Sequence, residues 1–290
     1  MNISLWSTGV IGFQANARLE REAPLMELLV IDETTEDTYY RCLHDEIPAD
    51  PRVIAMRKAW RVRFQPRGHR AKVLKNDAGQ VVGLTNYIPV EHSPYEGRNL
   101  MSILCMWIHG YDHLVGNQQA KGYGRFMLGE IEADARESGL DGLVVWAKDY
   151  DAWNPVSFYE HMGFERADQN GLDVLAWKPF NARAERPAFL NRNTLIATER
   201  PTDDKVAVTL FSNGWCGGGC QLCMMARDVA HGLPEEVVFT EVLAWEKEDM
   251  RERGESIDML YVEGEAFRPD GPPASPAELK AHLLSRFRSK

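Results

Sequence analysis

The segment that most constrains the fold of this chain is a turn with two closely spaced glycines, Gly122 and Gly124. The turn follows Ser102–Ile108, an apolar run that predicts a strand, and it opens an amphipathic helix that ends at Gly139. Glycines at such a position let the backbone approach a ligand closely and leave several N–H groups pointing outward at a helix N-terminus. A turn of this kind is suited to binding a pyrophosphate, helped by the positive end of the helix dipole.

Two other interpretations of the glycine turn are open. A loop with two glycines is also an ordinary entry into a helix, so the turn alone is a weak signal. A dinucleotide-binding fold requires Gly-x-Gly-x-x-Gly after the first strand, whereas these glycines follow a fourth or fifth predicted strand. Lys121 and Arg125 flank the turn and would add charge-assisted contacts to a phosphate.

A second motif, Asn154–Phe164, follows the turn and its helix. Between the two motifs, Leu143–Ala147 is a continuous apolar run, as expected for a strand in the centre of a sheet. The motif itself predicts a short helix that carries Tyr159 and stops at Gly163. Strand, glycine turn, helix, strand and tyrosine-bearing helix therefore follow one another along the chain.

This order and spacing resemble the GCN5-related N-acetyltransferase (GNAT) superfamily over roughly residues 25–180. The superfamily's pyrophosphate motif, Gln/Arg-x-x-Gly-x-Gly/Ala, matches Gln119–Gly124, and its Tyr-x-x-x-Gly-Phe motif matches Tyr159 to Phe164. The resemblance implies a mixed-sheet GNAT fold with acetyl-CoA as co-substrate. It also implies that Tyr159 protonates the leaving CoA thiolate and that Asn154 contacts the pantetheine arm. The CoA-binding residues expected on this basis are Trp107, Ile108, Gln119, Ala120, Lys121, Gly122, Tyr123, Gly124, Arg125, Asn154 and Tyr159.

The chain departs from the superfamily at Gly110–Asn117, which intervenes between the strand and the phosphate turn. Transfer to an amine also needs a base or a water relay, and an oxyanion donor that a splayed strand can supply. Cys105 would permit a covalent acyl-cysteine, but a small buried hydrophobe on a strand is the favoured interpretation, so direct transfer is predicted. No base stands out among the candidates near strand ends, which are Glu91, His92, His109, Asp112 and His113.

Three cysteines in one short segment, Cys216, Cys220 and Cys223, open a predicted helix after an apolar strand. A thiol at a helix N-terminus has a lowered pKa and suits thiol–disulfide exchange, while three thiolates suit a soft metal ion. The spacing also occurs in radical S-adenosylmethionine enzymes with a [4Fe–4S] cluster, but too few residues follow Cys223 for that fold. A glycine-rich turn with buried thiols is the remaining alternative.

The chain from Val206 onward predicts a separate unit in the order strand, cysteine turn, helix, strand, helix, two strands and helix. This order, together with Trp215-Cys216-Gly217, resembles the thioredoxin fold. A GNAT domain followed by such a unit resembles the YoaP-like acetyltransferases. The domains are therefore expected at 1–180 (GNAT acetyltransferase) and 206–290 (thioredoxin-like), with a linker at 181–205.

The region before the glycine turn predicts a first strand, two helices and a hairpin. Leu25–Ile31 is an apolar run, and Glu36–Ile47 and Arg52–Phe64 have helical character. Ala71–Lys75 and Val81–Pro89 flank a turn and predict paired strands. An α/β domain with a mixed sheet accommodates this order of elements.

The net charge of the chain limits the kinds of molecule that it is expected to bind. The 290 residues carry a net charge of −10, which argues against nucleic acid or an anionic membrane as partner. No run of about 18 apolar residues predicts a transmembrane helix. Five cysteines in a chain of this length do not form a secreted disulfide framework, so a reducing cytoplasm is expected.

The sequence thus predicts a cytoplasmic acyltransferase: an N-acetyltransferase that moves an acetyl group from acetyl-CoA to an amine of a small molecule or peptide. Direct attack by the amine and no obligatory metal are expected. The alternative is a thiol-redox or soft-metal-binding protein that acts through Cys216, Cys220 and Cys223, with a secondary or vestigial acyl-CoA site. A homodimer is left open.

Overall fold

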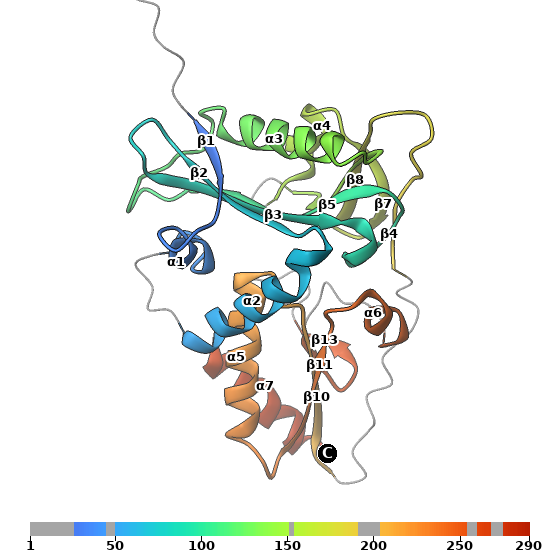
Figure 1. Ribbon diagram of the computed structural model, residues 1–290. Helices are drawn as coiled ribbons and strands as arrows, with labels where there is room; N and C mark the ends of the chain where they lie inside the picture. The colour runs from blue at the N-terminus through green and yellow to red at the C-terminus, as the bar shows by residue number, and fades with distance from the viewer. Residues whose placement is uncertain (1–25, 45–49, 151–153, 191–203, 254–259, 268–274) are drawn as a thin grey trace, which may run out of the picture.

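The computed structural model of the chain describes residues 26–44, 50–150, 154–190, 204–253, 260–267 and 275–290. Two α/β units lie one above the other in Figure 1, a larger one on a seven-stranded sheet and a smaller one on a four-stranded sheet. This arrangement confirms the predicted α/β class with a mixed sheet. Within the described residues, no helix is both long enough and apolar enough to cross a membrane.

The large sheet has the order β1-β2-β3-β5-β6-β8-β7, and all neighbours are antiparallel except β5 and β6. This parallel pair is short, because only Leu100–Ile103 pairs with Gly142–Val145. On its other side β5 continues along β3, with Leu104 as an extra residue between paired positions. The strands are β1 (Glu27–Val30), β2 (Arg70–Lys75), β3 (Val81–Pro89), β5 (Leu100–Ile108), β6 (Gly142–Lys148), β7 (Glu165–Asn170) and β8 (Asp173–Pro179).

Helices cover both faces of the large sheet (Figure 1). α3 (Tyr123–Glu137) and α4 (Val156–His161) lie over one face, and α1 (Glu36–Tyr40) and α2 (Pro51–Phe64) lie over the other. The face under α3 holds the main core, because the apolar stripe of α3 packs on the strands. The buried members of that stripe are Met127, Leu128, Ile131 and Ala135.

The helices on the other face begin and end for local reasons. Asp50 caps α2 by accepting a hydrogen bond from the Arg52 N–H, and Pro51 takes the first helical position. The predicted helix at Glu36–Ile47 is shorter than expected, since α1 ends at Tyr40. The cause is the backbone that follows, in which Cys42 and Leu43 both have positive φ values; residues 45–47 of that prediction lie outside the described chain.

The second unit has the sheet order β11-β10-β12-β13, with β10 parallel to β11 and antiparallel to β12. Its last helix begins with a capping box, in which Ser275 and Glu278 exchange hydrogen bonds. The helix after the cysteine turn starts at Gly217. The elements are β10 (Val206–Ser212), α5 (Gly217–His231), β11 (Val237–Leu243), α6 (Lys247–Arg253), β12 (Leu260–Val262), β13 (Glu265–Ala266) and α7 (Pro276–Arg288).

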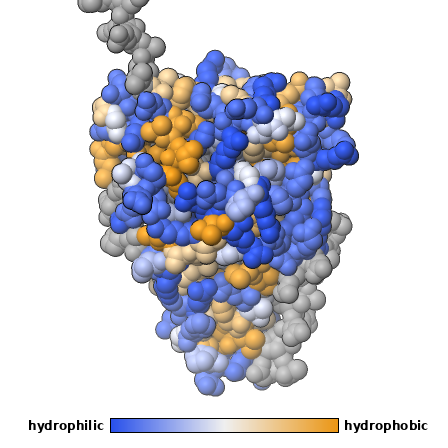
Figure 2. All heavy atoms as spheres, in the orientation of Figure 1, coloured by the Kyte–Doolittle hydropathy of each residue, from blue (hydrophilic) through white to orange (hydrophobic). Residues whose placement is uncertain are grey.

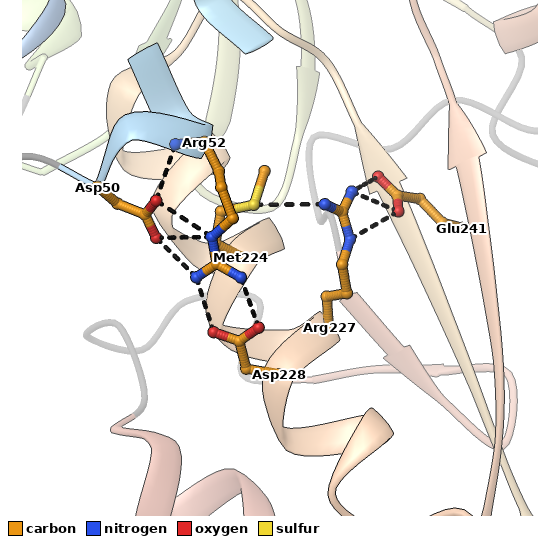
Figure 3. Close-up of polar contacts among 6 residues, drawn as sticks. All are labelled: Asp50, Arg52, Met224, Arg227, Asp228 and Glu241. Carbon is orange, nitrogen blue, oxygen red and sulfur yellow. Dashed lines mark hydrogen bonds and ion pairs between the residues drawn. The ribbon is translucent and has the colours of Figure 1, made fainter. Parts of the chain in front are cut away.

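Polar contacts join the two units. Figure 3 shows the Arg52 guanidinium of α2 paired with both carboxylate oxygens of Asp228 on α5, at 2.7 and 2.8 Å. The same view shows Arg227 of α5 paired with Glu241 of β11, which ties that helix to its own sheet. On α6, the buried Lys247 donates to two backbone carbonyls of the first unit.

Part of the predicted linker belongs to the first unit. β9 (Ala188–Phe189) pairs with β4 (Tyr95–Glu96), and Phe189 packs in a buried cluster of the first unit with Tyr95. Residues 191–203 of that segment lie outside the described chain. Figure 2 shows the face seen in Figure 1 as largely hydrophilic, with separate apolar patches in both units.

Candidate functional site

The candidate site is built around the point where β5 and β6 separate. Beyond Ile103, the edge of β5 that faces β6 is not paired with that strand. Backbone groups along a free strand edge can hydrogen-bond an extended ligand as if it were a further strand. Residues 104–108 of β5 therefore offer a binding edge that leads toward the glycine turn.

The glycine turn starts α3 just after this edge. Gly122 is the N-cap of α3, with φ of 87°, and Ala120 has φ of 59°. The first bond of the helix runs from the Phe126 N–H to the Gly122 carbonyl, so the N–H groups of residues 123–125 have no helical acceptor. Outward N–H groups at a helix start attract an anion. Gln119, Ala120, Lys121, Gly122 and Arg125 are exposed, Gly124 is half-buried and Tyr123 is buried.

The two glycines are needed for different reasons. At Gly122 a Cβ atom would meet nothing within 4 Å, so the requirement is the left-handed backbone. At Gly124 the backbone is ordinary for a helix, and a Cβ atom would lie 3.2 Å from Cζ of Phe158 on α4. Gly122 therefore shapes the turn, and Gly124 lets α4 approach it.

The inserted segment Gly110–Asn117 does not separate the strand from the turn. His109 Nδ1 lies 3.0 Å from the Gly116 carbonyl oxygen, and the Gln118 N–H donates to the His109 carbonyl at 2.8 Å. The Gln119 amide then donates to the carbonyl of Ile108 at 3.3 Å. The insertion closes on itself, so that Ile108 and Gln119 lie side by side.

Tyr159 lies on α4 with its side chain 1% exposed. Its hydroxyl donates to Asn154 Oδ1 at 2.8 Å, and the Asn154 amide donates to the carbonyl of Trp146 on β6. Burial raises the pKa of Tyr159, and the nearby thiol of Cys105 acts in the same direction. The tyrosine is therefore protonated at neutral pH, as a proton donor has to be.

Side chains of β5 face both sides of the sheet. Cys105 and Trp107 pack toward α1, in the cluster that contains Tyr39 and Tyr40, whereas Ile108 packs toward α3. Burial raises the pKa of the Cys105 thiol, which disfavours the thiolate that an acyl-cysteine would need. This geometry agrees with the predicted direct transfer.

None of the predicted base candidates is directed at the β5 edge by a described contact. The Glu91 carboxylate accepts the Asn99 N–H at 2.7 Å, and His109 holds the inserted loop. His92 lies against Phe64, and burial lowers the pKa of His92. Asp112 and His113 are exposed on the loop.

The cysteines of the second unit lie at the start of α5. Cys216 is the N-cap, where its sulfur accepts the Gly219 N–H at 3.4 Å, and Cys220 and Cys223 are fully buried. The expected lowering of pKa at the helix N-terminus is wrong. Burial raises the pKa of all three thiols, that of Cys223 to about 12, because desolvation outweighs the nearby hydrogen-bond donors and arginines.

Metal binding by these cysteines finds no support either. Across the described parts of the chain, no group of three or more His, Cys, Asp or Glu side chains is placed to hold a metal ion. All five cysteines are free thiols. The geometry is that of the remaining alternative, a glycine-rich helix start with buried thiols.

Two buried polar residues were missed by the sequence reasoning. His69 and Asn86 are 5% and 0% exposed, and neither side chain has a hydrogen-bond partner within the described chain. Native proteins pair most buried polar atoms, so such groups need an explanation. The available signal was a polar residue in an otherwise apolar strand, Asn86 within Val81–Pro89.

Comparison with solved structures matches about half of the chain to acetyltransferases at low sequence identity. An acetyltransferase from Thermus thermophilus has a TM-score of 0.38 and 18% identity, covering 53% of this chain and 96% of that one. The PaiA N-acetyltransferase from Thermoplasma acidophilum in complex with coenzyme A has a TM-score of 0.36 and 16% identity, covering 53% and 98%. Spermidine N-acetyltransferase from Vibrio cholerae in complex with CoA and spermine has a TM-score of 0.39 and 14% identity, covering 53% and 95%.

No protein-family model matches the chain. Among curated proteins, the uncharacterized N-acetyltransferase YoaP of Bacillus subtilis (strain 168) is 31% identical over 111 residues, which cover 36% of this chain. The match spans 41% of the length of that protein. Over part of its length, the chain is therefore similar to a curated N-acetyltransferase of Bacillus subtilis.

Proposed function

We propose that the chain is an N-acetyltransferase that uses acetyl-CoA to acetylate an amine of a small molecule or peptide. The relative position of three features, the β5 edge, the start of α3 and Tyr159, carries the proposal. The free edge of β5 leads to the open N-terminus of α3, and the protonated hydroxyl of Tyr159 lies beyond β6 on α4. The similarity to an N-acetyltransferase supports the same assignment.

The residues present suit coenzyme A. The N–H groups at the start of α3, with Lys121 and Arg125, would hold the diphosphate. The β5 edge at Trp107 and Ile108 would pair with the extended pantetheine arm, and Asn154 lies on the opposite side of the opening. Coenzyme A has a diphosphate joined to an extended amide chain. It can therefore use both the N–H groups of α3 and the edge of β5, whereas a free phosphate could use only the first.

The reaction then needs few protein groups. The neutral amine attacks the thioester carbon, a C–N bond forms and the C–S bond breaks. Tyr159 gives its proton to the leaving thiolate, whose pKa near 8.5 lies below that of a buried phenol. The proton released by the amine passes to water or to a base, and Tyr159 is reprotonated from solvent after the product leaves.

For the second unit we propose a thioredoxin-like domain without thiol chemistry. The order β11-β10-β12-β13, with α5 directly after the central strand β10, supports the fold. The raised pKa values of Cys216, Cys220 and Cys223 argue against redox catalysis. The proposed domains are 1–180, on which β9 (Ala188–Phe189) also packs, and 206–290. The five free thiols support a reducing compartment such as the cytoplasm.

The test is a screen of amines that measures CoA release, combined with thermal shift in acetyl-CoA. A shift in the melting temperature together with CoA release by an amine is the expected result. A shift without release for any amine would assign the chain to acyl-CoA sensing instead. No shift would overturn the proposal.

A further inference from the structure

A basic pocket lies at the rim of the sheet face that α2 covers. It has a volume of about 270 Å³, and its lining residues come from the end of β1, the start of β2 and the last turns of α2. This face is the one toward which Cys105 of β5 packs. The pocket is lined by Val30, Arg61, Gln65, His69, Arg70, Ala71 and Lys72.

Arg61 of α2 differs from its neighbours because its charge has no partner among the described residues. Arg52 is paired with Asp228, and Arg63 and Arg67 are both paired with Glu246. Arg61 is half-buried and makes no ion pair or side-chain hydrogen bond within the described chain. A cation held in this way is suited to an anion that comes from solution.

The other two cations that line the pocket have a partner on the far side of the sheet. Arg70 and Lys72 alternate with Ala71 along β2, so their charged ends lie on the α3 face, where both bind the carboxylate of Asp134, at 2.9 and 2.7 Å. Arg61 is therefore the cation that the α2 side of the pocket leaves uncompensated within the described chain. An arginine fork matches the geometry of a carboxylate or phosphate, so Arg61 selects for such a group.

His69 lies at the inner end of the pocket. Its ring packs edge-to-face on Trp60 at 4.7 Å between centroids, and both ring nitrogens are buried without a hydrogen-bond partner in the described chain. Burial and the charge of Arg61 lower the pKa of His69 to about 3, so the imidazole is neutral. A neutral ring offers one donor and one acceptor to a ligand in the pocket.

A row of residues connects the pocket with β5. Ala71 of β2 is the register partner of Asn86 on β3, and Asn86 is the partner of Cys105 on β5, so all three share one face. Asn86 is fully buried and interacts with the His69 ring, which opposes part of the lowering of the His69 pKa. Buried polar groups thus run from the pocket to the strand of the proposed acyl site.

We propose that this pocket receives the acceptor, and that the acceptor carries a carboxylate or phosphate that binds Arg61. The amine of such a molecule would reach past His69 and Asn86 toward β5. This inference rests on the proposed acetyltransferase function and adds the chemical class of the acceptor: a small amine with an acidic group.

The kinetic test compares amines that differ only in the acidic group: 2-aminoethyl phosphate with 2-aminoethanol, and L-glutamate with L-glutamine, with spermidine as a cationic acceptor. At least one acidic member should have a kcat/KM at least about tenfold above that of its neutral analogue. Arg61→Gln should lower that kcat/KM by about tenfold or more without changing the KM for acetyl-CoA, and Arg61→Lys should recover part of the loss. Arg288→Gln is the matched control, because Arg288 is exposed on α7 and the net charge changes equally.

Binding of inorganic phosphate, measured by calorimetry at constant ionic strength, tests the pocket without catalysis. Arg61→Gln should weaken phosphate binding about tenfold, and Arg288→Gln should leave it unchanged. Turnover of spermidine or the neutral amines alone, or an Arg61→Gln enzyme with unaltered kinetics, would overturn the acceptor class and leave the acetyltransferase proposal standing. Phosphate binding at Arg61 without CoA release from any amine would support the anion pocket and count against the acetyltransferase.

Discussion

The hydroxyl of Tyr159 donates a hydrogen bond to Asn154 Oδ1 across 2.8 Å, inside a site where the tyrosine side chain is 1% exposed. The bond fixes the direction of a protonated phenol near the separated strands. The Asn154 amide is fixed in turn by the Trp146 carbonyl of β6, so the orientation of the acid depends on the sheet itself. Changes at Tyr159 and at the glycine turn therefore separate proton donation from binding.

Tyr159→Phe removes the proposed acid and keeps the ring. Because general acid catalysis contributes about 10²–10⁴-fold, kcat should fall by about 10²-fold or more while the Kd of acetyl-CoA changes little. Stopped-flow measurement of CoA release and calorimetry provide the two values. Phe158→Leu, which alters the neighbouring ring without removing a proton, is the control; a Tyr159→Phe enzyme with wild-type kcat would contradict the assigned role.

Gly122→Ala should weaken CoA binding, whereas Gly129→Ala should not. The left-handed backbone of Gly122 disfavours a Cβ atom by roughly 1–2 kcal/mol, so the turn should change shape. Gly129 lies within α3 with nothing within 4 Å of an added Cβ, and alanine there should stabilise the helix by about 0.5–1 kcal/mol. Affinity for CoA and urea unfolding distinguish the two; equal affinities would show that the turn is not the diphosphate site.

The contact between units should depend more on Lys247 than on Arg52. Lys247 is 5% exposed and donates to the carbonyls of Val90, at 2.7 Å, and Tyr95, at 2.5 Å. Lys247→Met removes both of these charge-assisted hydrogen bonds and should cost about 1–3 kcal/mol in the free energy of unfolding. Arg52→Met breaks an exposed pair with Asp228 and should cost less than about 1 kcal/mol. The reverse order in urea unfolding would refute this account of the interface.

Acid should destabilise the protein through His69. The pKa of His69 is about 3 in the folded chain against an ordinary value of 6.5, so the unfolded chain takes up a proton first as pH falls. The free energy of unfolding should therefore decrease below pH 6.5, by up to about 1.4 kcal/mol for each pH unit, and the loss should continue to about pH 3. The His69→Gln variant should lose less stability between pH 6.5 and 5 than wild type, and the exposed-site variant His113→Gln should behave as wild type. Parallel curves for all three would contradict the burial of a neutral ring.

Local features of the fold were accessible from the sequence. The glycine turn and the start of α3, the apolar strand β6, the helix with Tyr159 and the capping box at Ser275 depend on residue type and spacing within a few positions. Backbone preference and periodicity act over the same short range. The mixed α/β class and the position of the candidate coenzyme site follow from these local signals.

Other features depend on contacts between segments that are far apart in the sequence. The sequence alone determined which turn could hold an anion, but not the surroundings of that turn. The tertiary structure decided that β5 leaves β6 after Ile103, that the thiols of Cys216 and its neighbours are buried and protonated, and that His69 lies close to Asn86. The physical reason is that burial and pKa depend on atoms far apart in the chain, which no local pattern of residues encodes.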